Sequence, residues 1–296
     1  MHSIDQSAAE AVSALTVTLP DGTTIPRLGQ GTWHMAEQPQ KRNDEIASLQ
    51  LGIEYGMTLI DTAEMYAGGR SESLLGEAVS GVARDRLFLV SKVYPHNAGK
   101  ARIFKSCEDS LRRLKTEALD LYLLHWRGSV PLEETVWCME ELIRQGKILR
   151  WGVSNFGLGD MEELWGVPGG RGCQTNQVLY HLGSRGVEFD LLPWMAQRKM
   201  PLMAYCPLAQ AGRLKRDLLS DPAVLKVAQR HGASPAQILL AFTLRSEAIF
   251  PVPKAGVPSH VADNAKAAAI RLDADDLAAL DSAFPAPRRK VPLDIQ

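Results

Sequence analysis

The 296-residue chain lacks a strong net charge, a cysteine pair and a long apolar run. Its 33 basic and 34 acidic residues give a formal charge of -1, so no overall field attracts nucleic acid or an anionic membrane. The four cysteines are scattered without a CxxC pair, so neither a disulfide framework nor a metal site is expected. No stretch reaches the roughly 18 apolar residues of a membrane span. We expect a monomer in the cytoplasm.

Length and composition alone do not decide the number of domains. A hydrophobic content of 45% is enough for one large core, and the length permits two average domains or one barrel. The first residues lack a basic start, and Glu10 interrupts their apolar part. We therefore expect residues 1–15 to be a flexible tail and residues 16–296 to be a single domain.

Short apolar runs alternate with longer amphipathic ones after a turn-rich segment, residues 17–29, that is typical of a β-hairpin. Such alternation indicates a parallel sheet with helical crossovers. Eight runs qualify as strands: 28–33, 58–61, 87–92, 119–125, 149–155, 173–178, 202–207 and 249–254. Most recur at the interval of about 30 residues that one strand-helix-strand step needs. This pattern predicts an α/β fold, a (β/α)8 TIM barrel with an N-terminal β-hairpin and extra C-terminal helices.

The helical runs carry recognisable spacing and caps. Ile46, Leu49 and Ile53 share one face of a helix, as the 3.6-residue period requires. Asp221 and Ser234 each precede a proline, which is typical of a helix start. These two capped helices fill the long interval before the eighth strand.

Titratable side chains follow three consecutive predicted strands. Asp61, Lys92 and His125 stand where the second, third and fourth strands end, and Tyr66 lies on the loop after the second. Each alone is an ordinary polar residue near a loop, but strand ends of a barrel converge on one mouth. A lysine ammonium beside a phenol lowers the phenol pKa, and a carboxylate keeps that lysine charged. The set suits proton donation to a carbonyl, with His125 as a hydrogen-bond donor or relay.

Eight motifs make the pattern specific: GTW, LIDTAEMY, LVSKV, YLLHW, WGVSN, NQVLYH, AYCPLAQ and VPK, in this order. Across nearly the whole chain the sequence resembles the aldo-keto reductase family, and within it the bacterial methylglyoxal and aldehyde reductases. The resemblance implies a catalytic tetrad of Asp61, Tyr66, Lys92 and His125, with Tyr66 as the general acid. It implies reduction of aldehydes, dicarbonyls and reactive ketones by a nicotinamide cofactor. No GxGxxG follows a predicted strand, which agrees with a family that has no Rossmann domain.

The resemblance also assigns the cofactor contacts. Ser154, Asn155 and Gln177 would bind the carboxamide, and Tyr205 would stack on the nicotinamide ring. The full set of cofactor positions that it implies is Thr32, Trp33, Asp61, Ser154, Asn155, Gln177, Tyr205, Cys206, Pro207, Leu208, Gln210, Gly212, Lys254, Ala255, His260, Asp263 and Asn264.

Two of these positions depart from the family pattern near the adenosine 2′-phosphate. Ala255 stands where many members that prefer NADPH have serine or threonine, and His260 stands where they have arginine. A hydroxyl and a bidentate guanidinium are therefore missing. NADPH is the expected cofactor, and NADH is a possible one.

The substrate site is described less fully. The resemblance places Trp33, Tyr66, Tyr94, His125 and Trp126 around a small-molecule carbonyl substrate. The loop after His125 and the C-terminal tail are short, so we expect an open pocket. Two other hypotheses stay open: a cofactor-binding regulatory subunit with little turnover, and a lyase that forms a Schiff base on Lys92.

Overall fold

The computed structural model describes residues 4–209 and 213–296, and eight parallel strands in this part of the chain form a barrel. The strands follow chain order around the sheet. They are β3 (Gln30–Gly31), β4 (Leu59–Asp61), β5 (Phe88–Val93), β6 (Leu121–Leu124), β7 (Trp151–Ser154), β8 (Asn176–Leu179), β9 (Leu202–Tyr205) and β10 (Ile249–Pro251). A parallel bridge between Gly31 and Lys254 joins the first strand to the segment after the last. The predicted barrel is confirmed.

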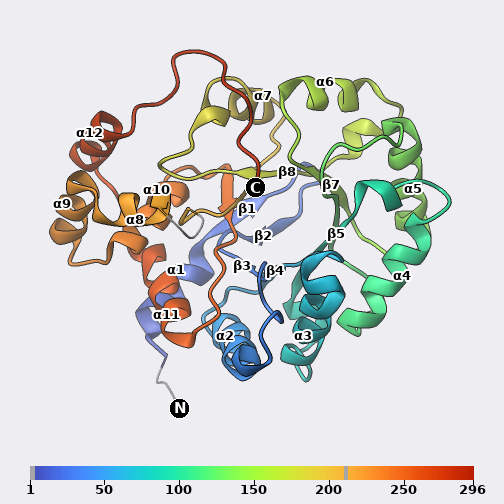
Figure 1. The fold of residues 1–296 in the computed structure, drawn as a ribbon, viewed down its shortest axis with the longest axis horizontal. Coiled ribbons are helices and arrows are strands. Elements are labelled where there is room, and N and C mark those ends of the chain that lie inside the picture. Colours follow the sequence, from blue (N-terminus) through green and yellow to red (C-terminus); the bar gives the residue numbers. More distant parts are fainter. Residues whose placement is uncertain (1–3, 210–212) are drawn as a thin grey trace.

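Helices surround the strands as an outer ring (Figure 1). The ring helices are α2 (Arg42–Glu54), α3 (Arg70–Ala78), α4 (Ile103–Leu114), α5 (Leu132–Arg144), α6 (Leu158–Gly166), α7 (Leu191–Gln197), α10 (Pro235–Leu244) and α11 (Pro258–Lys266). Three more helices lie outside the ring: α8 (Arg213–Ser220) and α9 (Pro222–His231) pack against α10, and α12 (Ala274–Ala283) packs against α9. The predicted extra C-terminal helices are therefore present. The two that the caps indicated are α9 and α10, and α8 and α12 are additional.

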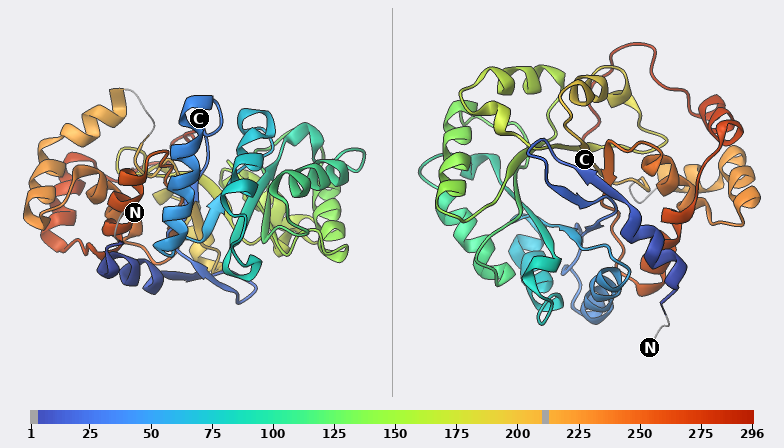
Figure 2. Two further views of the ribbon diagram at one scale, coloured as in Figure 1. Left: turned by 90° about the horizontal axis from the view of Figure 1, so that it is seen from below. Right: turned by 180° about the vertical axis from the view of Figure 1, so that it is seen from behind.

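The N-terminal hairpin closes the bottom of the barrel. Strands β1 (Thr16–Thr18) and β2 (Thr24–Pro26) pair antiparallel, as predicted, and lie across the end of the barrel that faces the viewer in the right-hand view of Figure 2. Their inward side chains, Val17 and Ile25, belong to the apolar cluster that fills the barrel interior. The barrel is thus plugged at one end, which leaves the opposite mouth, at the carboxyl ends of the strands, for ligands.

The predicted helix signals appear in the structure as hydrogen bonds. The Asp221 side chain accepts from two backbone N–H groups of α9. Ser234 and Gln237 cap each other reciprocally at the start of α10. Leu49 and Ile53 are buried on the inner face of α2, as their spacing requires.

The expectation of a flexible tail over residues 1–15 is wrong for its described part. Helix α1 (Gln6–Ala14) begins there, and the Asp5 side chain caps it by accepting from Ala8 N–H at 3.2 Å. Ala8 and Val12 are buried in a cluster that α1 shares with α11. The spacing of these apolar residues is helical, and this signal outweighs the interruption by Glu10.

None of the helices formed by the described residues is long and apolar enough to cross a membrane. The same residues contain no group of three or more histidine, cysteine or acidic side chains able to hold a metal ion. Cys107, Cys138 and Cys173 are free thiols, and all three are buried.

Candidate active site

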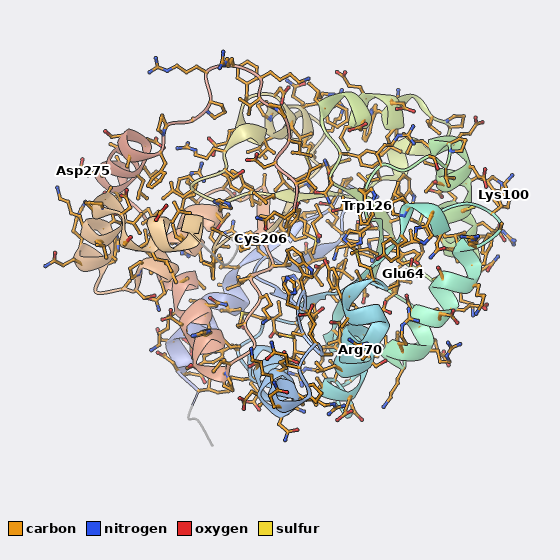
Figure 3. The ribbon with its side chains drawn as sticks, viewed as in Figure 1. Glu64, Arg70, Lys100, Trp126, Cys206 and Asp275 are labelled. Carbon is orange, nitrogen blue, oxygen red and sulfur yellow. The ribbon has the colours of Figure 1, made fainter. Side chains whose placement is uncertain are left out.

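The candidate site lies at the barrel mouth, where loops after several strands meet the C-terminal tail. In Figure 3 the labelled Trp126 and Cys206 lie toward the centre of this mouth, whereas Lys100 and Asp275 lie at the outer edges. The tail returns from α12 across the mouth, and the chain ends near the centre in Figure 1.

The four side chains of the predicted tetrad meet at this mouth, and the nitrogen of one of them, Lys92, contacts two of the others. Lys92 Nζ, at the end of β5, donates to Asp61 Oδ2 at 2.8 Å and lies 3.0 Å from the Tyr66 hydroxyl oxygen. It also donates to the Thr62 carbonyl oxygen at 2.9 Å. His125 follows β6, and its ring meets the edge of the Tyr66 ring at a centroid distance of 5.7 Å. The structure therefore brings the predicted tetrad together.

Burial controls the protonation of this cluster. Lys92 is fully buried and Asp61 nearly so. Burial raises the pKa of Asp61 and lowers that of Lys92, while the charge of each partner opposes both shifts. The 2.8 Å contact and the further hydrogen bonds to both groups favour the ionised pair.

The pKa of Tyr66 corrects the expectation that Lys92 lowers it. Burial raises this pKa well above its usual value near 10, and the negative charge of Asp61 adds to the rise. Asp61 offsets much of the lysine charge at the phenol, because the two form an ion pair. The phenol is thus held protonated, as a proton donor must be, and Lys92 can stabilise the phenolate when it forms.

His125 is held neutral. Burial lowers its pKa well below its usual value near 6.5, and the Lys92 charge lowers it further. Nδ1 is buried without a hydrogen-bond partner among the described residues, and the side chain lines a small cavity. A neutral imidazole facing this cavity can donate one hydrogen bond to a substrate oxygen.

Stability should fall between pH 7.5 and pH 5.5 because the folded chain holds two histidines neutral. Burial lowers the pKa of His125 well below 6.5 and that of His181 to about 4. The unfolded chain protonates both near pH 6.5, so it binds more protons and is favoured below that pH. We expect each histidine to cost about 1.4 kcal/mol of unfolding free energy at pH 5.5.

Urea denaturation at the two pH values measures this loss. The variant His181→Gln should lose about half as much between them as the unmodified chain, because only His125 then titrates. An unfolding free energy that stays constant over this interval would contradict the neutral assignment.

The predicted carboxamide residues form a hydrogen-bonded set next to the tetrad. Gln177 Nε2, on β8, donates to Asp61 Oδ1 at 2.9 Å, so both oxygens of Asp61 are engaged. The Tyr205 hydroxyl donates to Asn155 Oδ1 at 2.9 Å, and Ser154 Oγ donates to the Gln177 carbonyl oxygen. Gln177, Asn155, Ser154 and Tyr205 all line the small cavity of about 80 Å³ that also contacts Tyr66. These amides and hydroxyls suit a carboxamide ligand.

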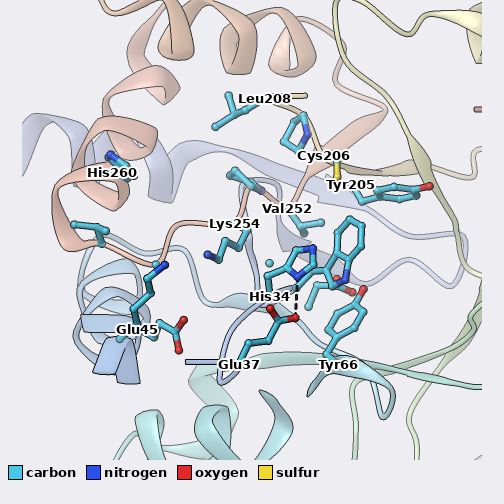
Figure 4. A pocket seen from close by; sticks show the side chains of 18 of the residues that line it. His34, Glu37, Glu45, Tyr66, Tyr205, Cys206, Leu208, Val252, Lys254 and His260 are labelled. Atoms are coloured by element: carbon cyan, nitrogen blue, oxygen red, sulfur yellow. Dashed lines mark hydrogen bonds and ion pairs between the residues drawn. The ribbon is translucent and has the colours of Figure 1, made fainter. Parts of the chain in front are cut away.

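A larger cleft of about 570 Å³ runs from the tetrad to the start of α11 (Figure 4). This volume lies within the range of ligand pockets. Most of its lining comes from the loops after β3, β9 and β10. The residues that line it are Gly31, Trp33, His34, Glu37, Gln38, Lys41, Glu45, Asp61, Tyr66, Tyr205, Cys206, Pro207, Leu208, Ala209, Val252, Pro253, Lys254, Gly256, Val257 and His260.

Several predicted cofactor positions do not line this cleft. Ala255 is packed in the apolar cluster shared with α1, and Asn264 is buried. Asp263 accepts hydrogen bonds from Ser234 Oγ and Gln237 Nε2. Thr32 is also buried, and its hydroxyl donates to the Asp61 carbonyl oxygen at 3.1 Å. Two further predicted positions, Gln210 and Gly212, lie outside the described residues.

The substrate side of the mouth is less open than expected. Trp33, Tyr66, His125 and Trp126 line the small cavity, as predicted. Tyr94 does not line this cavity, and its ring instead packs edge-on against the Trp126 ring at a centroid distance of 5.6 Å.

The tail accounts for the difference in openness. Ile295 and Gln296 line the same cavity, and Gln296 N–H donates to the Tyr205 hydroxyl at 3.4 Å. A hydrogen bond from Ser184 to Asp294 anchors this tail. Its short length suggested an open pocket, whereas its path across the mouth covers one side.

Sequence reasoning missed one wall of the cleft, which comes from the loop after β3 and the first turn of α2. The His34 ring stacks on the Trp33 ring at a centroid distance of 4.5 Å, and His34 Nδ1 forms a hydrogen bond with Glu37 Oε1 at 2.8 Å. Lys41 and Glu45 continue the wall toward α11. The concentration of polar residues between 34 and 45 was the one available signal, and it is also typical of an ordinary loop.

Comparisons with known proteins identify the family of the chain. The model of the Aldo/keto reductase family matches residues 27–284. The methylglyoxal reductase YeaE of Escherichia coli is 56% identical over 272 residues, 92% of this chain and 95% of that protein. The glyoxal reductase of Bacillus subtilis is 31% identical over 267 residues, 90% of this chain and 92% of that protein.

A solved structure extends the likeness to the fold. The aldo/keto reductase from Klebsiella pneumoniae, in complex with NADP and acetate, has a TM-score of 0.93 and is 51% identical. The match covers 95% of this chain and 99% of that one. With a family match over residues 27–284, the chain belongs to the aldo/keto reductase family.

Proposed function

We propose that this protein reduces aldehydes, dicarbonyls and reactive ketones to alcohols, with NADPH as the reductant. The observation that carries the proposal is Lys92 Nζ, which contacts both Asp61 and the Tyr66 hydroxyl at a mouth shared with a long cleft. This arrangement presents a proton donor and a charge that stabilises its conjugate base.

The cofactor, when bound, supplies the hydride. Tyr66 donates its phenolic proton to the carbonyl oxygen, and Lys92 holds the resulting phenolate through the 3.0 Å contact. Asp61 keeps Lys92 charged and in place. His125 orients the carbonyl oxygen by donating a hydrogen bond as a neutral imidazole.

The described residues fit a dinucleotide along the cleft. Gln177 and Asn155 offer amide groups for the carboxamide, and the Tyr205 ring offers a flat surface for the nicotinamide. Lys254 lines the far end of the cleft, where a phosphate needs a cation, and His260 lines the same end. The lack of an arginine at position 260 supports a place for NADH as a weaker second cofactor.

The substrate class follows from the size of the site and from the relatives. Trp33 and Trp126 give apolar walls to the small cavity next to Tyr66, which suits small carbonyls. The similar proteins include a methylglyoxal reductase and a glyoxal reductase. We propose methylglyoxal-like dicarbonyls as the best substrates. Arg127 would not recognise a carboxylate, because it bonds Glu163 and two backbone carbonyls.

Titration with NADPH and NADH, followed by tryptophan fluorescence, tests the cofactor assignment. Trp33 lines both cavities, so we expect either cofactor to quench its emission. NADPH should bind at least about tenfold more tightly than NADH, because Lys254 would pair with the 2′-phosphate. Absorbance at 340 nm with methylglyoxal then measures turnover. A protein that binds neither cofactor, or oxidises neither with any carbonyl, overturns the proposal.

A Schiff-base lyase is disfavoured by the surroundings of Lys92. Its Nζ is fully buried and lies in contact with Asp61, Thr62 and Tyr66 at 3.0 Å or less. A nucleophilic amine must instead be neutral and free to reach a carbonyl. Incubation with methylglyoxal and borohydride should leave Lys92 unmodified.

A regulatory subunit with little turnover is disfavoured by the presence of all four tetrad side chains in contact distance. Cofactor binding without turnover over a broad carbonyl panel would favour it instead.

We also propose that residues 16–296 act as one barrel domain and that the protein works as a monomer in the cytoplasm. The three free, buried cysteines agree with a reducing compartment.

A further inference from the structure

Glu45 is a buried acid in a wall of the cleft that the proposed reaction does not use. It lies in the first turn of α2 and is 2% exposed, yet it lines the larger cavity. Within the described part of the chain it receives one hydrogen bond, from Ala36 N–H to Oε2 at 2.9 Å. A carboxylate accepts up to about four hydrogen bonds, so this group retains capacity for a ligand.

The surroundings of Glu45 place it at the end of the cleft that holds Lys254 and His260. Figure 4 shows Glu45, Lys254 and His260 around this end, away from Tyr66. A Cβ built on Gly256 would lie 3.0 Å from Lys254 Nζ and 3.6 Å from Glu45 Cγ. Glu45 and Lys254 thus converge on the same short backbone segment.

A buried negative charge at this position acts differently on the two cofactors. It repels the 2′-phosphate of NADPH, and the repulsion is weakly screened because the carboxylate is buried. A ribose 2′-hydroxyl, by contrast, donates readily to a carboxylate, and acids serve this role in other dinucleotide sites. Because both side chains lie next to Gly256, the charge of Glu45 also offsets part of the attraction between Lys254 and the phosphate.

We propose that Glu45 is a residue that determines cofactor specificity, limiting the preference for NADPH and admitting NADH. The proposal rests on the proposed function, since it assigns the phosphate end of the same cleft. The same role explains why His260 stands in place of arginine in this site. Glu45 and His260 would both weaken the binding of a 2′-phosphate, as expected of a site that accepts both cofactors.

The test is the variant Glu45→Gln, measured by steady-state kinetics with each cofactor and methylglyoxal. Glutamine keeps the acceptor oxygen for Ala36 N–H and removes only the charge. We expect the ratio of kcat/KM for NADPH to that for NADH to rise by about three- to tenfold.

Asp44→Asn is the matched control. Asp44 is the adjacent residue in the same turn, and its replacement by asparagine changes the net charge by the same amount as Glu45→Gln. It is exposed and does not line the cleft. Its ratio should change by less than about twofold, because water screens an exposed charge. Equal shifts in both variants would indicate a general charge effect and overturn the proposal.

The remaining outcomes are also separable. An unchanged or lower ratio in Glu45→Gln overturns the specificity role. A similar rise in KM for both cofactors, with no change in ratio, would assign Glu45 to holding the loop at Ala36 and would likewise overturn it. Failure of the unmodified protein to oxidise either cofactor would instead overturn the proposed function.

Discussion

Replacing Tyr66 with phenylalanine is expected to lower kcat/KM for methylglyoxal reduction by about 10³-fold, with NADPH binding unchanged within about twofold. The phenol is the buried proton donor, and its pKa is held well above 10, so at neutral pH it carries the proton that the carbonyl oxygen must receive. The phenylalanine ring preserves the contacts with His125 and Trp33 but cannot donate. Steady-state kinetics and fluorescence titration of the same variant separate chemistry from binding.

Tyr55→Phe provides the matched control for the loss of a phenol. Tyr55, at the C-terminal end of α2, is also buried, and its hydroxyl accepts from Asp5 N–H at 3.3 Å. It lines neither of the two cavities at the mouth. Its kcat/KM should remain within about twofold. If Tyr66→Phe kept more than about a tenth of the activity, another group would have to supply the proton.

Replacing Lys92 with methionine should lower both the catalytic activity and the unfolding free energy. Activity should fall by at least about 10²-fold, because the phenolate that Tyr66 must become loses its positive partner. Unfolding free energy should fall by about 3–5 kcal/mol, because Asp61 is then left buried without its counter-charge. Carbonyl reduction assays and urea denaturation at pH 7.5 measure the two losses separately.

The double variant Asp61→Asn with Lys92→Met tests the reason for the stability loss. Removing both charges leaves no unpaired ion in the core, so a large part of the unfolding free energy should return. Activity should not return, because the lysine charge is still missing. Equal instability in the single and double variants would show that packing at position 92, and not the buried charge, sets the cost.

The fold was predictable because its signals are local and repeat. Each strand is a short apolar run, and each helix carries its own period or cap, as Ser234 and Gln237 do at the start of α10. The first helix was missed because one polar residue, Glu10, was given more weight than the spacing of Ala8 and Val12. The path of the C-terminal tail has no such local signal, since it depends on distant contacts such as Ser184 with Asp294.

The site was predictable to the extent that strand ends define it. Asp61, Lys92 and His125 occupy consecutive strand ends, so barrel geometry alone brings them together. The protonation of Tyr66 was not predictable in the same way, because its pKa depends on the balance between burial, Asp61 and Lys92. The role of Glu45 depends likewise on which wall of the cleft α2 supplies, which periodicity does not indicate.

A crystal structure of the protein with NADP+ and a non-reacting carbonyl ligand would test the central claim most directly. That claim is that a phenol held by Lys92 faces the carbonyl beside the nicotinamide. We expect the nicotinamide ring on the face of Tyr205, with the ligand oxygen about 3 Å from the Tyr66 hydroxyl oxygen. A nicotinamide bound away from Tyr205, or a ligand oxygen out of hydrogen-bond reach of Tyr66, would contradict it.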